Sequence, residues 1–387
     1  MTRCDTPTDR SRPRPSRSGA GLVLVLACTV WGCPSTQPLV PRTIDDRYEV
    51  CENPTAVAAW GRAQELLRGG QQAQAIELLR QCVDLCAGNV WYHIAYQDTA
   101  FALPRVEVGG EFVEVPATVA MRRLYAELED DGESPLPPYL RARLERMDQR
   151  EATCEQLLEE ALRRAPAFYF AMYESGLKWR GVDRPGLAAA ELERAVRSRP
   201  QFLEARRALA EVYVELGEWP GAIRHYELYL AERPDDYPVL REYLALIVYQ
   251  VDGREEEAGE LVDKLIARHP QDLTLQMDRA AISWQLGDLG TAAQTYKSVV
   301  QQDHEDARAV LNLGNLYYEM GMQATDQERR ERWEKARTAY RYFLSLGESA
   351  DFHDLFDLHF NVPYRLSELQ REVGPGKPGP VTWQDIK

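Results

Sequence analysis

Residues 203–234 read LEARRALAEVYVELGEWPGAIRHYELYLAERP, and this stretch decides the fold. Apolar residues recur every three or four positions on both sides of Gly217, which is the spacing that places them on one buried face of an α-helix. Glycine commonly follows the last residue of a helix, and proline cannot continue one. The stretch therefore predicts a hairpin of two helices, Leu203–Leu216 and Trp219–Glu232, which end at Gly217 and Pro234.

The same hairpin recurs along the chain. Small residues align the segments with spacings of 34, 36, 34 and 44, at Ala188, Ala222, Ala258, Ala292 and Ala336. Twelve positions after the first three alanines stand Pro200, Pro234 and Pro270, and five positions before the middle three stand Gly217, Gly253 and Gly287. One hairpin cannot bury its apolar faces alone, so neighbouring hairpins must stack.

This pattern resembles the tetratricopeptide repeat, which has a period of 34 residues. Five units are clear over residues 169–347, a sixth covers about 137–168, and a degenerate unit covers 55–88. The resemblance implies an all-α, right-handed superhelical solenoid of helix hairpins that binds a protein or an extended peptide.

This interpretation divides the chain into seven segments. They are a signal peptide (1–32), a lipidated tether (33–52), a degenerate helical repeat (53–98), an insertion with a β-hairpin and a helix (99–136), the repeat array (137–347), a C-terminal capping helix region (348–374) and a flexible tail (375–387). The hairpin is predicted because residues 106–115 alternate in polarity around Gly109 and Gly110. The insertion is either inert or an arm specific for a partner.

The N-terminus has the layout of an export signal. An arginine-rich stretch precedes the mostly apolar residues 19–31, which are too few for a comfortable membrane span. The segment Val30-Trp31-Gly32-Cys33 resembles a lipoprotein processing site, which implies acylation of Cys33 and an outer-membrane protein that faces the periplasm. Cys28 is a rival site, and simple signal-peptide cleavage and an uncleaved anchor remain open.

The charge argues against nucleic acid as a partner. Residues 1–32 carry five arginines and two aspartates, so the net charge of −15 leaves −18 for the remaining residues. A chain this acidic repels phosphate backbones, and no stripe of basic residues offsets the repulsion.

The cysteines predict one disulfide. With Cys33 acylated, an even four remain in an oxidising compartment. We predict a Cys51–Cys86 bond, because Cys51 precedes the first helix pair and can fold back on its end, and buried thiols at Cys82 and Cys154. No zinc-protease motif, phosphate loop or nucleophile elbow occurs, so no catalytic residue, metal or cofactor is predicted.

In this family the first helix of each unit lines a concave groove. The resemblance implies groove-facing positions at Phe170, Tyr173, Glu174, Arg207, Glu211, Met277, Asp278, Trp284, Leu311, Asn312, Asn315 and Tyr318. Family grooves often use an asparagine at the Asn312 offset to bind a peptide backbone. The alternative is that some of these side chains pack between helices.

We expect a periplasm-facing scaffold, not an enzyme, that binds a protein partner in cell-envelope biogenesis, secretion or pilus assembly. This level rests on analogy, because a fold does not fix a function. The alternative is an envelope enzyme, or its regulatory subunit, that acts on peptidoglycan or polysaccharide.

Overall fold

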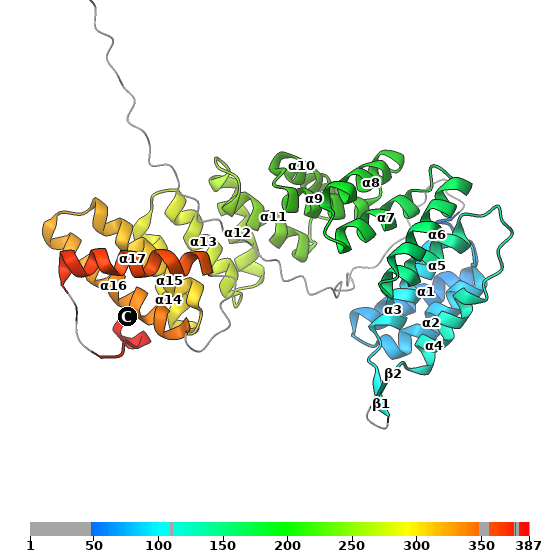
Figure 1. Cartoon of the computed structure of the whole chain (residues 1–387), viewed down its shortest axis with the longest axis horizontal. Helices are drawn as coiled ribbons and strands as arrows, with labels where there is room; N and C mark the ends of the chain where they lie inside the picture. The colour runs from blue at the N-terminus through cyan, green and yellow to red at the C-terminus, as the bar shows by residue number, and fades with distance from the viewer. Residues whose placement is uncertain (1–47, 109–110, 348–355, 375, 377–378, 387) are drawn as a thin grey trace, which may run out of the picture. The chain divides into compact units, whose positions relative to one another are not determined.

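The computed structural model describes residues 48–108, 111–347, 356–374, 376 and 379–386 (Figure 1). The predictions for residues 1–47, including the signal peptide and the acylation of Cys33, lie outside the described residues. The chain divides into two compact units between Leu246 and Ile247. We call the described residues up to Leu246 the N-terminal unit and those from Ile247 the C-terminal unit.

Helices make up nearly all of both units. The N-terminal unit holds α1 (Pro54–Arg68), α2 (Gln72–Leu85), α3 (Val90–Ala102), α4 (Pro116–Ala126), α5 (Leu136–Met147), α6 (Glu151–Arg164), α7 (Tyr169–Gly181), α8 (Pro185–Ser198), α9 (Leu203–Leu216), α10 (Trp219–Glu232) and most of α11 (Tyr237–Tyr249). The C-terminal unit holds α12 (Glu255–Arg268), α13 (Leu273–Gln285), α14 (Leu289–Gln302), α15 (Ala307–Gln323), α16 (Asp326–Gly347), α17 (Phe356–Val373) and the short 3₁₀ helix η2 (Trp383–Ile386). Within the described ranges, no helix combines the length and apolar character needed to cross a membrane. The predicted all-α array of helix hairpins is confirmed, and α9 and α10 have the predicted bounds.

The alanines that align the repeats lie where the two helices of a hairpin cross. All five are 0% exposed: Ala188, Ala222, Ala258, Ala292 and Ala336. Gly176 marks the same crossing on the first helix of its repeat, α7. A Cβ atom at this position would lie only 2.6 Å from the Leu192 side chain of α8, so only glycine fits. These small residues let the helix axes approach closely, and larger side chains fill the space beside them.

Glycine and aspartate define the helix ends. Gly217 follows α9 with φ 74°, and Gly253 and Gly287 take the same left-handed conformation with φ 85° and 83°. Residues with a side chain rarely adopt this conformation, which explains the glycines. Asp272 and Asp306 cap α13 and α15, because each carboxylate accepts a backbone N–H two residues on, at 2.9 and 3.0 Å.

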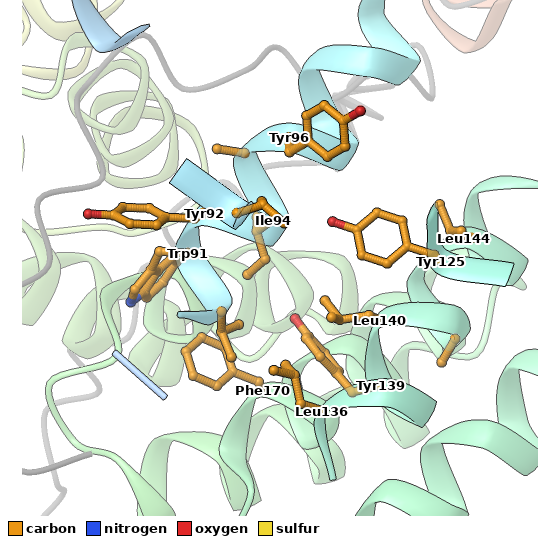
Figure 2. Packing of buried hydrophobic residues seen from close by; sticks show 14 of the residues in the cluster. Trp91, Tyr92, Ile94, Tyr96, Tyr125, Leu136, Tyr139, Leu140, Leu144 and Phe170 are labelled. Atoms are coloured by element: carbon orange, nitrogen blue, oxygen red, sulfur yellow. The ribbon is translucent and has the colours of Figure 1, made fainter. Parts of the chain in front are cut away.

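Aromatic side chains form the core of the N-terminal unit. Figure 2 shows Phe170 of α7 with Trp91 of α3 and Tyr139 of α5 near it. The ring centroids of Trp91 and Phe170 lie 5.2 Å apart, and those of Phe170 and Phe202 lie 5.5 Å apart. Edge-to-face contacts of this kind add to the burial of large apolar surfaces, so they hold α3 to the repeats that follow.

The insertion carries two short strands. β1 (Val106–Val108) and β2 (Glu111–Val113) pair antiparallel, with Val106 opposite Val113. α3 runs past the boundary drawn between residues 98 and 99, so the insertion grows out of this helix and does not begin after it.

The C-terminal segment differs from the predicted flexible tail. Ile386 is only 6% exposed and belongs to the core of the C-terminal unit, where η2 packs on α14 and α16. The guanidinium of Arg337 donates to the Gly374 carbonyl oxygen at 2.7 Å, which fixes the start of the tail. Trp383 lies against His304, with ring centroids 5.7 Å apart. These contacts join residues distant in sequence, and composition alone could not reveal them.

We predict that Ala222→Leu lowers the free energy of unfolding by about 1–3 kcal/mol, because added methylene groups force the crossing of α9 and α10 apart. Chemical denaturation followed by circular dichroism measures this change. Ala231→Leu is the matched control, since Ala231 is exposed on the same helix α10. Equal stability of the two variants would show that the helices do not cross at Ala222.

Candidate functional site

Three predicted groove residues lie in the core. Phe170 is 0% exposed and Met277 is 5% exposed, so neither can contact a partner in the folded chain. The prediction was wrong for both, because the family offset specifies a helix face but not what packs against it. In the case of Phe170, that face is covered by Trp91 from α3. Leu311 is likewise buried.

Glu174 belongs to a buried ion network and not to a groove. Its carboxylate accepts from Arg143 at 3.1 Å and from Arg146, and Arg143 also donates to Gln97 at 2.9 Å and to Asp98 at 2.5 Å. Burial alone would raise the pKa of Glu174, but the two arginines lower it below its usual range. The network ties α3, α5 and α7 together, and removing one partner would leave a buried charge unpaired.

On the first helices of the N-terminal unit, arginines and glutamates pair from one repeat to the next. Arg180 of α7 donates to Glu211 and, at 2.7 Å, to Glu215 of α9. Arg207 of α9 donates to Glu211 at 2.8 Å and to Glu242 of α11 at 2.6 Å. We call these five residues the ion-pair ladder.

The ladder repeats with the register of the fold. Both Arg180–Glu215 and Arg207–Glu242 join residues 35 positions apart, about one repeat. Burial, and then the nearby Glu211, raise the pKa of Glu242 to about 7, although Arg207 opposes the shift. Arg207 was predicted to face a partner. It lies on a first helix, α9, as expected, but its guanidinium is bound to Glu211 and Glu242. Tyr173 is half-buried on α7, and its ring lies 5.0 Å from that of Phe202.

The C-terminal unit carries aromatic side chains in place of the arginines. One per repeat stands at a spacing of 35 and 34 residues; we call Tyr249, Trp284 and Tyr318 the aromatic row. The Tyr249 hydroxyl donates to Asp278 at 2.7 Å, and the Trp284 indole N–H donates to Glu319 at 2.6 Å. Trp284 and Glu319 are half-buried, so part of each remains accessible.

In the last repeat, the chain's own helix α17 takes the predicted groove positions. The Asn315 amide oxygen accepts from Tyr340 at 2.8 Å and from Arg365 of α17. The Tyr318 hydroxyl donates to Glu368 of α17 at 3.0 Å. Asn315 and Tyr318 therefore contact α17, a contact that the prediction did not include, and each remains half-buried. The sequence predicted a capping helix in this region, but it did not predict which side chains of the last repeat that helix covers.

Asn312 is half-buried and lies beside the buried Tyr296, to which its amide is hydrogen-bonded. Its side chain is therefore committed in part to packing between α14 and α15. The first-helix positions that the family offsets did not include are Arg180, Glu215, Glu242, Tyr249 and Glu319. The signal that could have found most of them is the separation of 35 residues between complementary side chains.

The cysteines pair as predicted from the sequence. Cys51 and Cys86 form a disulfide across 35 residues, with Cα atoms 5.9 Å apart. Cys82 and Cys154 are buried free thiols. Burial raises the pKa of Cys82 to about 11 and that of Cys154 to about 12, so both stay protonated and unreactive at neutral pH.

A buried glutamate holds the residues around this disulfide. Glu49 is 6% exposed, and its carboxylate accepts from Tyr169 and, at 3.1 Å, from Arg199. The Glu49 carbonyl oxygen accepts from Asn89 at 2.8 Å. Residues 48–53 therefore form a strap that is fixed to α3, α7 and α8 and, through Cys51, to the end of α2.

The described residues hold no group of three histidine, cysteine, aspartate or glutamate side chains placed to bind a metal ion. His93 is buried between the Tyr125 hydroxyl at 2.9 Å and the Ala87 carbonyl oxygen at 2.8 Å. Burial lowers its pKa to about 4, so it is neutral and structural.

Two family profiles match the chain. One, described as "Tetratricopeptide repeat", matches residues 182–247, and one described as "TPR repeat" matches residues 284–321. These segments are tetratricopeptide repeats. Proteins with such repeats generally act as scaffolds that bind protein or peptide partners.

Solved structures of tetratricopeptide repeat proteins are similar to the chain, at low identity. YrrB, "a TPR protein with an unusual peptide-binding site", is 14% identical with a TM-score of 0.43 over 50% of this chain and 94% of YrrB. MamA from Desulfovibrio magneticus RS-1 is 14% identical with a TM-score of 0.40 over 47% of this chain and 97% of MamA. A tetratricopeptide repeat protein from Parabacteroides merdae is 12% identical with a TM-score of 0.38 over 82% of this chain and 100% of its own. No curated protein matches the sequence.

We predict that mass mapping of unreduced peptides finds Cys51 joined to Cys86, with Cys82 and Cys154 free. Replacing both bonded cysteines by serine should lower stability by about 2–4 kcal/mol, because the unfolded chain regains the freedom of a long loop. Cys82→Ser is the control for loss of a thiol without loss of a bond. A variant without the disulfide that melts like the wild type would show that the bond does not hold the strap.

Proposed function

We propose that this chain is a periplasm-facing lipoprotein that serves as a scaffold for a protein partner in cell-envelope biogenesis, such as secretion or pilus assembly. The observation that favours the periplasm over the cytosol is the disulfide between Cys51 and Cys86. Disulfides form and persist in oxidising compartments and are rare in the cytosol. The export signal expected over residues 1–32 supports the same compartment.

Acylation at Cys33 would hold the repeats near a membrane. Fourteen residues separate Cys33 from Tyr48, the first residue of the strap. At full extension they span at most about 50 Å, since each residue adds about 3.3–3.6 Å. The strap itself is fixed by Glu49 and Cys51, so this end of the folded part would stay within this distance of the lipid surface.

The first-helix faces are the surfaces that would receive a partner. The ion-pair ladder and the aromatic row offer charged and aromatic side chains that are half-buried or, at Glu215, exposed. Arginine and aromatic residues are the usual anchors of interfaces. The ladder also holds its side chains in fixed positions before a partner arrives, which lowers the entropic cost of binding.

We predict that a palmitate analogue labels the wild-type protein in cells and does not label Cys33→Ala. A thioether bond of lipid to that sulfur is impossible once the sulfur is removed. Label that persists in Cys33→Ala but disappears in Cys28→Ala would move the site, and label absent from the wild type would refute the lipoprotein proposal.

The scaffold proposal is tested by photo-crosslinking in cells. A photoreactive residue at Val214 of α9, which lies about one helical turn after Glu211, should give a discrete crosslinked species. The same residue at the exposed Leu228 of the second helix α10 is the control and should give none. Crosslinking that is equal at both positions, or absent at both, would contradict binding on this face.

A further inference from the structure

The carboxylates on the first helices of the two units differ in what they bind. In the ion-pair ladder, Glu211, Glu215 and Glu242 each accept from a guanidinium. In the C-terminal unit, Trp284 takes the place of an arginine and donates its indole N–H to Glu319 at 2.6 Å. Across the described residues, no lysine or arginine pairs with Glu319. Its other hydrogen bond comes from the amide of Gln323 at 3.3 Å.

One repeat further on, the chain itself places a cation on the aromatic row. The guanidinium carbon of Arg365 in α17 lies 5.3 Å from the ring centroid of Tyr318. Arg365 also donates to the Asn315 amide oxygen and, at 3.0 Å, to the Tyr340 hydroxyl oxygen. An aromatic face flanked by oxygen acceptors attracts a cation through the charge distribution of the ring and through hydrogen bonds. The combination of ring and acceptor on the first helices is therefore suited to a guanidinium.

We propose that the face of α13 and α15 around Trp284 and Glu319 binds an arginine- or lysine-containing segment of the partner protein. The cationic head group lies over the Trp284 indole and pairs with the Glu319 carboxylate. This inference rests on the proposed scaffold function, and it names the chemistry of the partner. Tryptophan offers a stronger cation-binding face than tyrosine, so this position is better suited to a cation than the one that Arg365 occupies.

Charge complementarity supports a basic segment and not an acidic one. Asp278 is only 3% exposed and is bound by Tyr249, so its negative charge adds to the local potential without being a direct partner. The chain beyond residue 32 carries a net charge of −18, which steers a basic partner toward it and repels an acidic one.

The test compares two labelled peptides of equal length, one rich in arginine and one rich in glutamate, by fluorescence anisotropy with the full mature chain. The wild type should bind the arginine-rich peptide, and added salt should weaken that binding because the paired charges are partly exposed. The glutamate-rich peptide should not bind.

Point variants distinguish binding at Trp284 and Glu319 from nonspecific attraction of the peptide to an acidic chain. Trp284→Ala should weaken binding by about two- to thirtyfold, and Trp284→Phe should keep part of the affinity, because a ring remains. Glu319→Gln should weaken binding by about two- to fivefold while keeping an oxygen that can accept from the indole N–H. Glu334→Gln removes the same charge from an exposed position on α16 and should leave the affinity unchanged.

Three results would overturn the inference: preference for the glutamate-rich peptide, binding of neither peptide, or equal loss in Glu319→Gln and Glu334→Gln. Melting curves of each variant establish that the fold is intact. Crosslinking at Val214 is read separately and does not depend on these residues. If it persists while the peptide test fails, the scaffold function stands and only the chemistry assigned to its partner is wrong.

Discussion

The close crossing of two helices at one small residue is the constraint on which the rest of the structure depends. Ala222 is fully buried between α9 and α10, and the four equivalent alanines are buried in the same way. Because the helices can approach only where a side chain is small, each crossing fixes how the two helices of a repeat are rotated. That rotation decides which side chains face the neighbouring repeat and which face outward.

The stacking of successive repeats brings residues that are one repeat apart in the sequence into contact. Side chains one repeat apart lie side by side on successive first helices, so a separation of 35 residues recurs in Arg180–Glu215, Arg207–Glu242 and Trp284–Glu319. Tyr249–Asp278 departs from this rule with a separation of 29. Such contacts are long-range in sequence but are generated by a local rule, which is why a solenoid can be analysed repeat by repeat.

The sequence was sufficient to predict the repeats, but it was insufficient to predict which other segments pack against them. The bounds of α9 and α10, the buried thiols of Cys82 and Cys154 and the disulfide could be reasoned from local patterns. Phe170 and Glu174 could not, because their partners Trp91 and Arg143 lie outside the five clear units over residues 169–347. Ile386 presents the same difficulty: its burial depends on surfaces of α14 and α16 that no pattern near residue 386 describes.

The C-terminal helix α17 places an arginine on the aromatic row, which is the same kind of contact that we propose for the partner. The last repeat of a solenoid has no following neighbour to cover its apolar face, and α17 supplies that cover with Val362 and Leu369, each 1% exposed. Arg365 and Glu368 add polar contacts to the row that a partner would otherwise meet. Because α17 belongs to the same chain, its high effective concentration favours it over any free segment at Tyr318. Trp284 lies one repeat back, and none of the contacts of α17 described above involves it. A partner with the same cationic chemistry would therefore find its acceptor at Trp284 without having to displace the cap.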